Sequence, residues 1–176
     1  TSLNNIGLFF GGRDLTSVKH ALKMVKEKKI RVIELRESGM LPLYIDGADE
    51  SNQHKQLIKG GGGAHTKEKI IASASNKFIC LVDESKRVSE LGSFPLPIEV
   101  LPMSRSLVSR TIVSMGGVPI YRNGFITDHQ NHIIDVTGLD FSDPSDLEKK
   151  LNAIPGVVDN GVFARNKPDL VIFPKD

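Results

Sequence analysis

Cysteine, tryptophan and long apolar runs are scarce or absent in this sequence of 176 residues. The single cysteine, Cys80, excludes a disulfide within the chain and fits a reducing compartment, so we expect a cytoplasmic protein. No stretch approaches the roughly 18 to 20 apolar residues of a membrane-spanning helix, and we expect no membrane partner. An excess of one charge is also lacking. The 23 basic and 21 acidic side chains leave a net charge of +2, which favours no nucleic-acid partner.

Signals for a metal site or a serine hydrolase are missing as well. The histidines do not stand at metal-ligand spacing with Cys80 or a carboxylate, so we expect no metal and interpret them as surface residues. These are His20, His54, His65, His129 and His132. Cys80 lies in the apolar run 78–82 and is predicted to be a buried small hydrophobe. There is no Gly-x-Ser-x-Gly motif. With 39% hydrophobic and 25% charged residues, the composition is that of a soluble globular protein.

The first half of the chain alternates short apolar runs with segments of helical period. The pattern predicts helices over residues 18–29 and 67–75, and strands over 30–35, 41–45 and 77–82. This alternation is typical of a parallel sheet with helices packed on it. Asp46 and Asp83 directly follow two of the predicted strands. Ligands of such sheets bind at the carboxyl ends of the strands, so we expect a site there.

A second unit begins after the two prolines of residues 94–97 (FPLP), which hold the chain extended. Strands are predicted over 98–101, 119–122, 125–127, 133–136 and 157–163. Helices are predicted over 104–115 and from a cap at Asp143 or Ser145 to Leu151. This order of elements fits a small split βαβ unit. The apolar run 170–173 is predicted to return to the first sheet.

Four consecutive glycines, Gly60 to Gly63, separate Lys59 from the predicted helix that carries Glu68. Such a run is expected where the main chain passes very close to another group, although a flexible surface loop remains an alternative for the glycines alone. The spacing matches neither a P-loop nor the G-x-G-x-x-G of dinucleotide-binding folds. A glycine turn that enters a helix presents free N–H groups, which favour an anion or a developing oxyanion.

Charged side chains surround this glycine run in the sequence. Lys59 brings a positive charge beside the glycine amides. Glu68 fits two interpretations, a carboxylate that complements the helix dipole or a general base that reaches back over the loop. Asp46 and Asp49 lie three residues apart after a predicted strand, and either one alone fits an Asx-turn. Two acids that face a lysine and a glycine loop together indicate an active site.

The motifs resemble those of the ribose-5-phosphate isomerase A family. The similarity extends from about residue 30 to residue 172 without an obvious gap. Its most specific parts are residues 46–50 (DGADE), 58–69 (IKGGGGAHTKEK), 83–86 (DESK) and 94–100 (FPLPIEV). The resemblance implies a cytoplasmic aldose-ketose isomerase of the non-oxidative pentose phosphate pathway, which interconverts D-ribose 5-phosphate and D-ribulose 5-phosphate. It implies no metal, no cofactor and a homo-oligomer, either a dimer or a tetramer.

The resemblance also implies the fold. The expected class is α/β, with a Rossmann-like parallel-sheet domain over residues 1–93 and 164–176 and a smaller inserted α+β (ferredoxin-like) domain over 94–163. Its implied catalytic residues are Glu68, Lys59 and Asp46. Glu68 is the base that moves a proton between C1 and C2 through a cis-enediolate, Lys59 stabilises the enediolate oxygen, and Asp46 assists ring opening and hydroxyl proton transfer. The residues themselves agree, because an aldose-ketose shift needs one carboxylate base and one electrophile.

Substrate binding is implied for a second set of residues, namely Asp49, Gly60, Gly61, Gly62, Lys86, Thr16 and Ser17. The last two align with a serine-rich turn of the family. The family's upstream Gly-Thr-Gly-Ser-Thr phosphate loop has no counterpart here. Because every later catalytic position is intact, we interpret this as residues missing from the N-terminal part rather than as lost phosphate binding. Two alternatives stay open: a sugar-phosphate-sensing effector domain without catalysis, and an isomerase of another phosphosugar.

Overall fold

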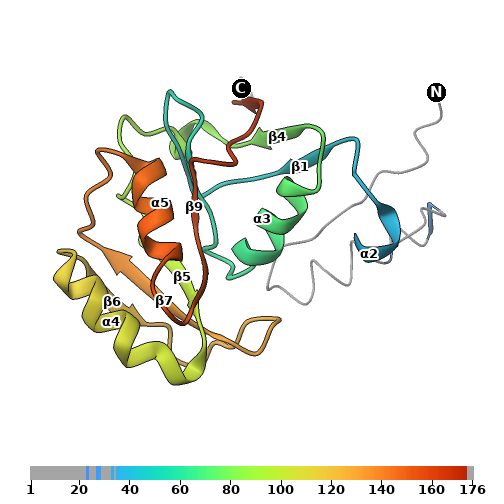
Figure 1. Ribbon diagram of the computed structural model, residues 1–176. Helices are drawn as coiled ribbons and strands as arrows, with labels where there is room; N and C mark the ends of the chain where they lie inside the picture. The colour runs from blue at the N-terminus through green and yellow to red at the C-terminus, as the bar shows by residue number, and fades with distance from the viewer. Residues whose placement is uncertain (1–22, 24–26, 29–32, 34, 174–176) are drawn as a thin grey trace.

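The computed structural model describes residues 23, 27, 28, 33 and 35–173, which are the coloured parts of Figure 1. Lys23 and Glu27 are helical, as predicted for the segment 18–29. The predicted strand over 30–35 is wrong at its end, because Leu35 begins the short helix α2 (Leu35–Ser38). Arg36 and Glu37 follow there, and both are good helix formers. The predicted binding residues Thr16 and Ser17 lie outside the described residues.

A parallel sheet forms one end of the molecule, with helix α3 (His65–Ser73) beside it (Figure 1). Its strands are β1 (Tyr44–Asp46), β4 (Phe78–Leu81) and β10 (Leu170–Ile172), in the order β1-β4-β10. The aromatic rings of Tyr44, Phe78 and Phe163 pack into its core together with Cys80, which is fully buried as predicted. The register that pairs Val171 with Cys80 confirms that the last apolar run returns to the first sheet.

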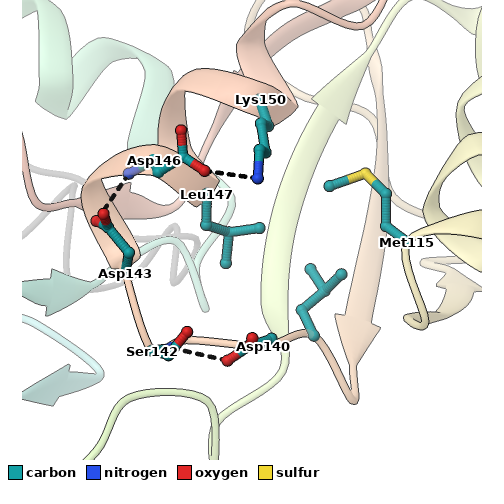
Figure 2. Close-up of a pocket in the computed structure, with 8 residues that line it drawn as sticks. Met115, Asp140, Ser142, Asp143, Asp146, Leu147 and Lys150 are labelled. Atoms are coloured by element: carbon teal, nitrogen blue, oxygen red, sulfur yellow. Dashed lines mark hydrogen bonds and ion pairs between the residues drawn. The ribbon is translucent and has the colours of Figure 1, made fainter.

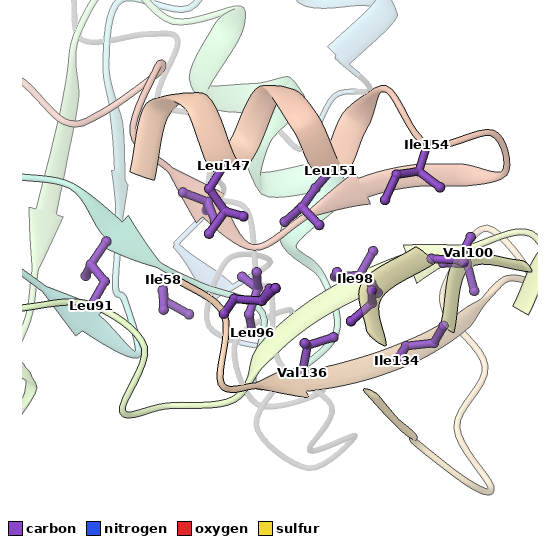
Figure 3. Packing of buried hydrophobic residues seen from close by; sticks show 14 of the residues in the cluster. Ile58, Leu91, Leu96, Ile98, Val100, Ile134, Val136, Leu147, Leu151 and Ile154 are labelled. Atoms are coloured by element: carbon purple, nitrogen blue, oxygen red, sulfur yellow. The ribbon is translucent and has the colours of Figure 1, made fainter. Parts of the chain in front are cut away.

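A four-stranded antiparallel sheet with two helices forms the second part of the molecule. The strands are β5 (Leu96–Val100), β6 (Val118–Tyr121), β7 (His132–Thr137) and β8 (Val157–Asn160), in the order β6-β7-β5-β8. Helices α4 (Arg105–Ser114) and α5 (Pro144–Asn152) complete the order βαββαβ, which confirms the predicted split βαβ arrangement. Figure 3 shows Leu147 and Leu151 of α5 packed toward Ile98 and Leu96 of β5.

Local side-chain hydrogen bonds explain one correct and one wrong prediction in this part. Asp143 caps α5 by accepting hydrogen bonds from the backbone N–H of Ser145 and Asp146, at 3.1 and 3.0 Å. The strand predicted over 125–127 is absent. The Thr127 hydroxyl instead accepts the N–H of His129 and of Asn131, at 3.2 and 3.0 Å, and so stabilises a turn where the apolar pattern had suggested an extended chain.

A second three-stranded sheet, which the sequence did not reveal, connects the two parts. Its antiparallel strands are β2 (Glu50–Ser51), β3 (Leu57–Ile58) and β9 (Val162–Phe163), in the order β2-β3-β9. Strand β9 belongs to the predicted strand 157–163, which is broken at Gly161. A Cβ at Gly161 would lie 2.2 Å from the Lys59 carbonyl oxygen. This close approach sets the position of Lys59 directly after β3.

The remaining regular elements are two short 3₁₀ helices, η1 (Glu84–Lys86) and η2 (Pro102–Ser104). None of the helices that the structure describes is both long enough and apolar enough to cross a bilayer. The domain boundaries at residues 93 and 163 stay a prediction, since β9 pairs with β3 on the other side of the proposed boundary.

Candidate active site

Lys59 is the centre of a buried charge cluster. Its ammonium nitrogen lies 3.0 Å from Asp46 Oδ2 and 3.1 Å from Glu68 Oε2, and it also donates to the carbonyl of Gly47. The Lys59 backbone N–H donates to the Gly161 carbonyl at 2.9 Å, which fixes the residue at the end of β3. The ammonium also stands 5.6 Å from the centre of the Phe163 ring. The structure thus brings together the three residues expected to be catalytic.

Glu68 lies in the first turn of α3 and is only 5% exposed. Burial is the main reason that its pKa is raised from 4.5 to about 7, and the negative charge of Asp46 adds to the rise. Lys59 opposes both effects but does not cancel them. A carboxylate with a pKa near neutrality can both take up and release a proton, as a general base and acid must.

Lys59 keeps its positive charge despite being buried. Burial alone would lower its pKa, but the adjacent carboxylates of Glu68 and Asp46 raise the pKa above the usual value for lysine. The cluster therefore holds one fixed cation between two acids. Such a cation in a water-poor site can stabilise negative charge that develops on a substrate oxygen.

Asp46 is held by two groups besides Lys59. The Gly47 N–H donates to Asp46 Oδ1 at 2.8 Å, and the Tyr44 hydroxyl donates to Asp46 Oδ2. Burial and the charge of Asp46 raise the pKa of Tyr44 well above its usual range, so the hydroxyl stays a donor. Sequence reasoning missed Tyr44. The signal was available, because residues two apart in a strand point to the same face.

The glycine loop, residues 60–63, packs tightly against the protein itself. Gly60 and Gly63 have φ angles of 104° and 78°, which side chains rarely adopt. A Cβ at Gly60 would lie 2.6 Å from His65 Nδ1, and one at Gly63 would lie 2.0 Å from the Phe125 ring. The close approach expected from the sequence is therefore present, but at these two positions the approaching group is a side chain of this protein.

The backbone amides of the loop differ in their availability. The Gly61 N–H donates to Asp49 Oδ2 at 2.8 Å, and the Gly63 N–H closes a turn onto the Gly60 carbonyl at 2.8 Å. The Gly62 N–H has no hydrogen-bond partner among the described residues. Asp49 thus holds the loop in place, and Gly62 offers an unused donor beside it.

Lys86 is not in contact with this cluster. It lies in η1, directly after β4, where the Asp83 carboxylate caps the turn by accepting the Ser85 N–H at 3.0 Å. The Lys86 ammonium forms no hydrogen bond or ion pair with any residue the structure describes. Its predicted role in substrate binding therefore stays a prediction.

His65 corrects the interpretation of the histidines as surface residues. It is fully buried at the start of α3, with Nε2 3.4 Å from the carbonyl oxygen of Asp159. Burial, helped by the charge of Lys69, lowers the pKa of His65 to about 4, so the ring is neutral. His132 is partly buried, with its ring centre 5.1 Å from that of Tyr121. His54 and His129 are exposed as predicted, and His20 lies outside the described residues.

Two residues of the second part reach this region and were missed by sequence reasoning. Glu99, 1% exposed, accepts hydrogen bonds from the hydroxyls of Thr66 and Thr127 and from the Asn131 amide, and so joins the start of α3 to the turn 127–131. Arg122 donates to the Gly61 carbonyl at 3.0 Å. No local pattern could reveal these contacts, because the partners are 28 or more residues apart in the chain.

A cavity of about 410 Å³ lies elsewhere, between α5 and the end of β7 (Figure 2). Its acidic side chains already have local partners. Asp143 caps α5, Asp146 pairs with Lys150 at 2.6 Å, and Asp140 accepts the Ser142 N–H at 2.8 Å. This cavity has no buried base beside a cation, and it does not compete with the Lys59 cluster as a catalytic site. In the described part of the chain, no group of three or more histidine, cysteine or acidic residues could hold a metal ion.

Comparisons with known proteins agree on one family. The model of the family described as "Ribose 5-phosphate isomerase A (phosphoriboisomerase A)" matches residues 15–176. A relative from Acidithiobacillus ferrooxidans, named ribose-5-phosphate isomerase A, is 54% identical over 149 residues, which are 85% of this chain and 68% of the relative. The crystal structure of ribose 5-phosphate isomerase A from Neisseria gonorrhoeae matches with a TM-score of 0.86 and 49% identity, over 90% of this chain and 71% of that one. A D-ribose-5-phosphate isomerase structure in complex with phospho-erythronic acid matches with a TM-score of 0.81 and 37% identity, over 87% and 70%.

Proposed function

Because this chain belongs to the ribose-5-phosphate isomerase A family, we propose that Glu68, Lys59 and Asp46 carry out the family's reaction in it. That reaction is the aldose-ketose interconversion of D-ribose 5-phosphate and D-ribulose 5-phosphate in the pentose phosphate pathway. The relatives are named isomerases, and the alternative of a sensing domain without catalysis has no support among them. The observation that carries the assignment of residues is the buried contact of Lys59 with Glu68 and Asp46, at 3.1 and 3.0 Å.

Glu68 is the base in this proposal. Its ionised carboxylate takes the proton from C2 of the open-chain aldose, and the electron pair of the C–H bond forms the C1=C2 bond of a cis-enediolate while O1 gains negative charge. The same carboxyl group then returns the proton to C1, which gives the ketose. A pKa near 7 suits both steps, since neither the acid nor the carboxylate is too stable at neutral pH.

Lys59 and Asp46 act on the oxygens. As charge develops on O1, the buried ammonium of Lys59 stabilises it, and one such donor is typically worth about 3 to 4 kcal/mol. Asp46 accepts the proton that leaves the C2 hydroxyl and delivers it to O1, so that the net reaction moves two hydrogens and changes no oxidation state overall. The Tyr44 hydroxyl keeps Asp46 Oδ2 beside Lys59.

Substrate binding is proposed for the residues around this cluster. Asp49 and Lys86 follow the parallel strands β1 and β4, at whose carboxyl ends α/β sheets bind ligands, and the glycine loop, with Gly60, Gly61 and Gly62, follows β3 and Lys59. The positive charge of Lys86 suits an anionic sugar phosphate. Thr16 and Ser17 are proposed to contribute to phosphate binding.

The organisation of the protein is proposed as well. A Rossmann-like domain over 1–93 and 164–176 with an inserted domain over 94–163 is supported by two core clusters, one formed mostly by residues of 94–163 and the other mostly by residues outside that range. A cytoplasmic location and a homo-oligomer are proposed too, and the homo-oligomer is supported by exposed apolar side chains on η2, α4 and β6, namely Met103, Leu107, Val113, Val118 and Ile120. Burial of these side chains against a second copy would remove apolar surface from water.

Deuterium exchange tests the assignment of the base. The wild-type protein, incubated with ribose 5-phosphate in deuterated water, should introduce label at C2 of the aldose and C1 of the ketose, while Glu68→Gln should do neither. Glu84→Gln is the matched control, because Glu84 is exposed and, among the residues that the structure describes, its carboxylate pairs with Arg87 alone. A folded Glu68→Gln protein with near-normal turnover would refute the mechanism. Arabinose 5-phosphate and unphosphorylated ribose, run as comparators, measure the preference among sugars.

A further inference from the structure

We propose that Arg122 is a positioning residue that holds the glycine loop so that the Gly62 N–H is fixed on the substrate side. The inference rests on the proposed function, since it assigns the oxyanion side of the same site. It goes beyond that function by making a residue of the antiparallel part responsible for the shape of a catalytic loop that follows β3.

The side chain of Arg122 is itself firmly held. Its Nε donates to Asp135 Oδ2 at 2.7 Å, and Nη2 pairs with Asp135 Oδ1. Asp135 lies in β7, and the Arg122 backbone N–H donates to the Ile133 carbonyl of the same strand at 3.0 Å. A planar guanidinium that makes two parallel bonds to one carboxylate has a fixed orientation. The remaining N–H groups of the guanidinium, on Nη1 and Nη2, can therefore act as donors of fixed direction.

That donor points at the carbonyl oxygens of the glycine loop. Nη1 lies 3.0 Å from the Gly61 carbonyl oxygen, and both Nη1 and Nη2 lie 3.5 Å from that of Gly60. The guanidinium carbon is also 5.0 Å from the centre of the Phe125 ring. The tip of this ring occupies the space next to Gly63, where a Cβ would lie only 2.0 Å away. Arg122 and Phe125 therefore hold the loop at Gly60, Gly61 and Gly63.

Because each peptide group is planar, fixing the direction of a loop carbonyl also fixes the direction of the N–H that follows it. The described chain has no cis peptide bond, and in a trans peptide the C=O and the following N–H point in opposite directions. Holding the Gly60 carbonyl directs the Gly61 N–H away from Arg122, where it meets Asp49 Oδ2 at 2.8 Å. Holding the Gly61 carbonyl likewise directs the Gly62 N–H away from Arg122. This N–H is the one without a partner among the described residues.

A glycine loop needs such a support if it is to serve catalysis. Glycine has the largest conformational freedom of all residues, and a donor stabilises a transition state only if its direction is already set. A displacement of about 1 Å in a catalytic group can cost on the order of a hundredfold in rate. The positive charge of Arg122 on the carbonyl side also polarises the peptide groups and strengthens their N–H donors.

Steady-state kinetics of Arg122→Gln test the inference. We expect kcat to fall about 10- to 100-fold, while KM changes less than about 3-fold, because the loop amide acts mainly in the transition state. The acidic limb of the pH profile should not move, because Arg122 has no contact with Glu68 or Lys59. Arg122→Lys keeps the charge without the fork and should be intermediate. Asp135→Asn should change kcat in the same direction by a smaller factor.

Asp128→Asn is the matched control. It removes the ion pair with Lys67 that also joins the 122–135 region to α3, but it does not touch the loop. Its kcat should equal that of the wild type. Amide hydrogen exchange gives a direct readout: the Gly61 and Gly63 N–H groups, which are hydrogen-bonded to Asp49 Oδ2 and to the Gly60 carbonyl, should exchange faster in Arg122→Gln and not in Asp128→Asn.

The outcomes separate this inference from the proposed function. If Glu68→Gln is inactive and folded Arg122→Gln has wild-type kcat, the role of Arg122 is refuted and the proposed function stands. A loss of kcat together with a shifted acidic limb refutes it too, since Arg122 would then act through Glu68. If Glu68→Gln is active, the proposed function fails and this inference fails with it. Should Arg122→Gln not fold, Arg122→Lys and Asp135→Asn decide by the same criteria.

Discussion

The Lys59 ammonium lies 3.1 Å from Glu68 Oε2, and the two side chains are only 4% and 7% exposed. Removing two charges from water is costly, and one pair alone would repay that cost only with good geometry and further hydrogen bonds. Here Asp46 supplies a second carboxylate at 3.0 Å from Lys59. The two carboxylates keep Lys59 charged, while burial, with the negative charge of Asp46 added, leaves Glu68 with a raised pKa. The cluster therefore gives its members different roles: Lys59 is a fixed positive charge that can act as the electrophile, and Glu68 is a carboxyl group that can act as the base.

The first prediction concerns the pH dependence of kcat/KM. Glu68 must be ionised to remove a proton, so activity should rise with pH through about 7, the raised pKa of Glu68. Lys59→Met removes the charge that lowers this pKa and should move the acidic limb of the residual activity to higher pH. Rates measured between pH 5 and 9 check both. An acidic limb at the ordinary glutamate pKa of 4.5 would contradict the assignment.

The second prediction concerns Lys59 and the separation of kcat from KM. Lys59→Met keeps most of the side-chain volume over the Phe163 ring but removes the charge. We expect kcat to fall about 100- to 1000-fold, as for the loss of an oxyanion donor, with a much smaller change in KM. Lys77→Met, at an exposed position before β4, is the control and should leave both constants unchanged. A change confined to KM would show that Lys59 only binds the substrate.

The third prediction is a stability difference that depends on pH. A carboxyl group whose pKa is raised by folding stabilises the folded state below its unfolded pKa, here 4.5, and this stability is lost as pH rises through about 7. Glu68→Gln cannot ionise and escapes this loss. Its stability relative to wild type should therefore improve by about 3 kcal/mol between pH 4 and pH 8, from a shift of 4.5 to about 7.

Urea unfolding of both proteins at pH 4 and pH 8 measures that difference. Glu84→Gln is again the control, since Glu84 is exposed and no change with pH is expected beyond that of the wild type. Equal stability differences at the two pH values would show that the pKa of Glu68 is not raised. The prediction also implies that the catalytic base is kept at a cost in stability.

Most of the elements that could be predicted from the sequence have a signal within a few neighbouring residues. The apolar runs at β4 and β10 and the Asp143–Pro144 start of α5 have the expected structure, because burial and capping act over a few residues. The strands of the β2-β3-β9 sheet have two residues each, too few for any alternation to be seen. The strand expected over 125–127 failed because the Thr127 hydroxyl stabilises a turn.

The residues of the candidate site also divide into those with a local sequence signal and those placed by contacts between distant segments. Asp46, Lys59 and Glu68 were found because each stands beside a strand end or a glycine run, and the structure places them within 3.1 Å contacts. His65 looked like any surface histidine, but it is buried by contacts with the Asp159 segment and with Gly60, which no local pattern shows. Arg122 contacts the glycine loop across 61 residues of sequence, and no pattern near Arg122 in the chain predicts that contact.

The fourth prediction separates two reasons for glycine in the loop. Gly63 has a positive φ of 78°, and a Cβ there would lie 2.0 Å from the Phe125 ring. Gly124 has a similar φ of 69°, but a Cβ there would meet nothing within 4 Å. Gly124→Ala should therefore cost only the backbone strain, about 1 to 2 kcal/mol. Gly63→Ala should cost this strain plus that of forcing the ring out of a packed site, typically a further 1 to 3 kcal/mol.

Thermal or urea unfolding of the two alanine variants compares these costs, and kinetics report on the site. Gly63→Ala should also lower kcat, because displacing Phe125 moves the support of the loop, whereas Gly124→Ala should leave kcat unchanged. Adding Phe125→Leu to Gly63→Ala makes room for the new methyl group and should recover part of the stability that Gly63→Ala alone loses relative to Phe125→Leu. Equal costs for the two glycine substitutions would mean that only backbone conformation selects glycine at residue 63, and that the Phe125 ring yields freely.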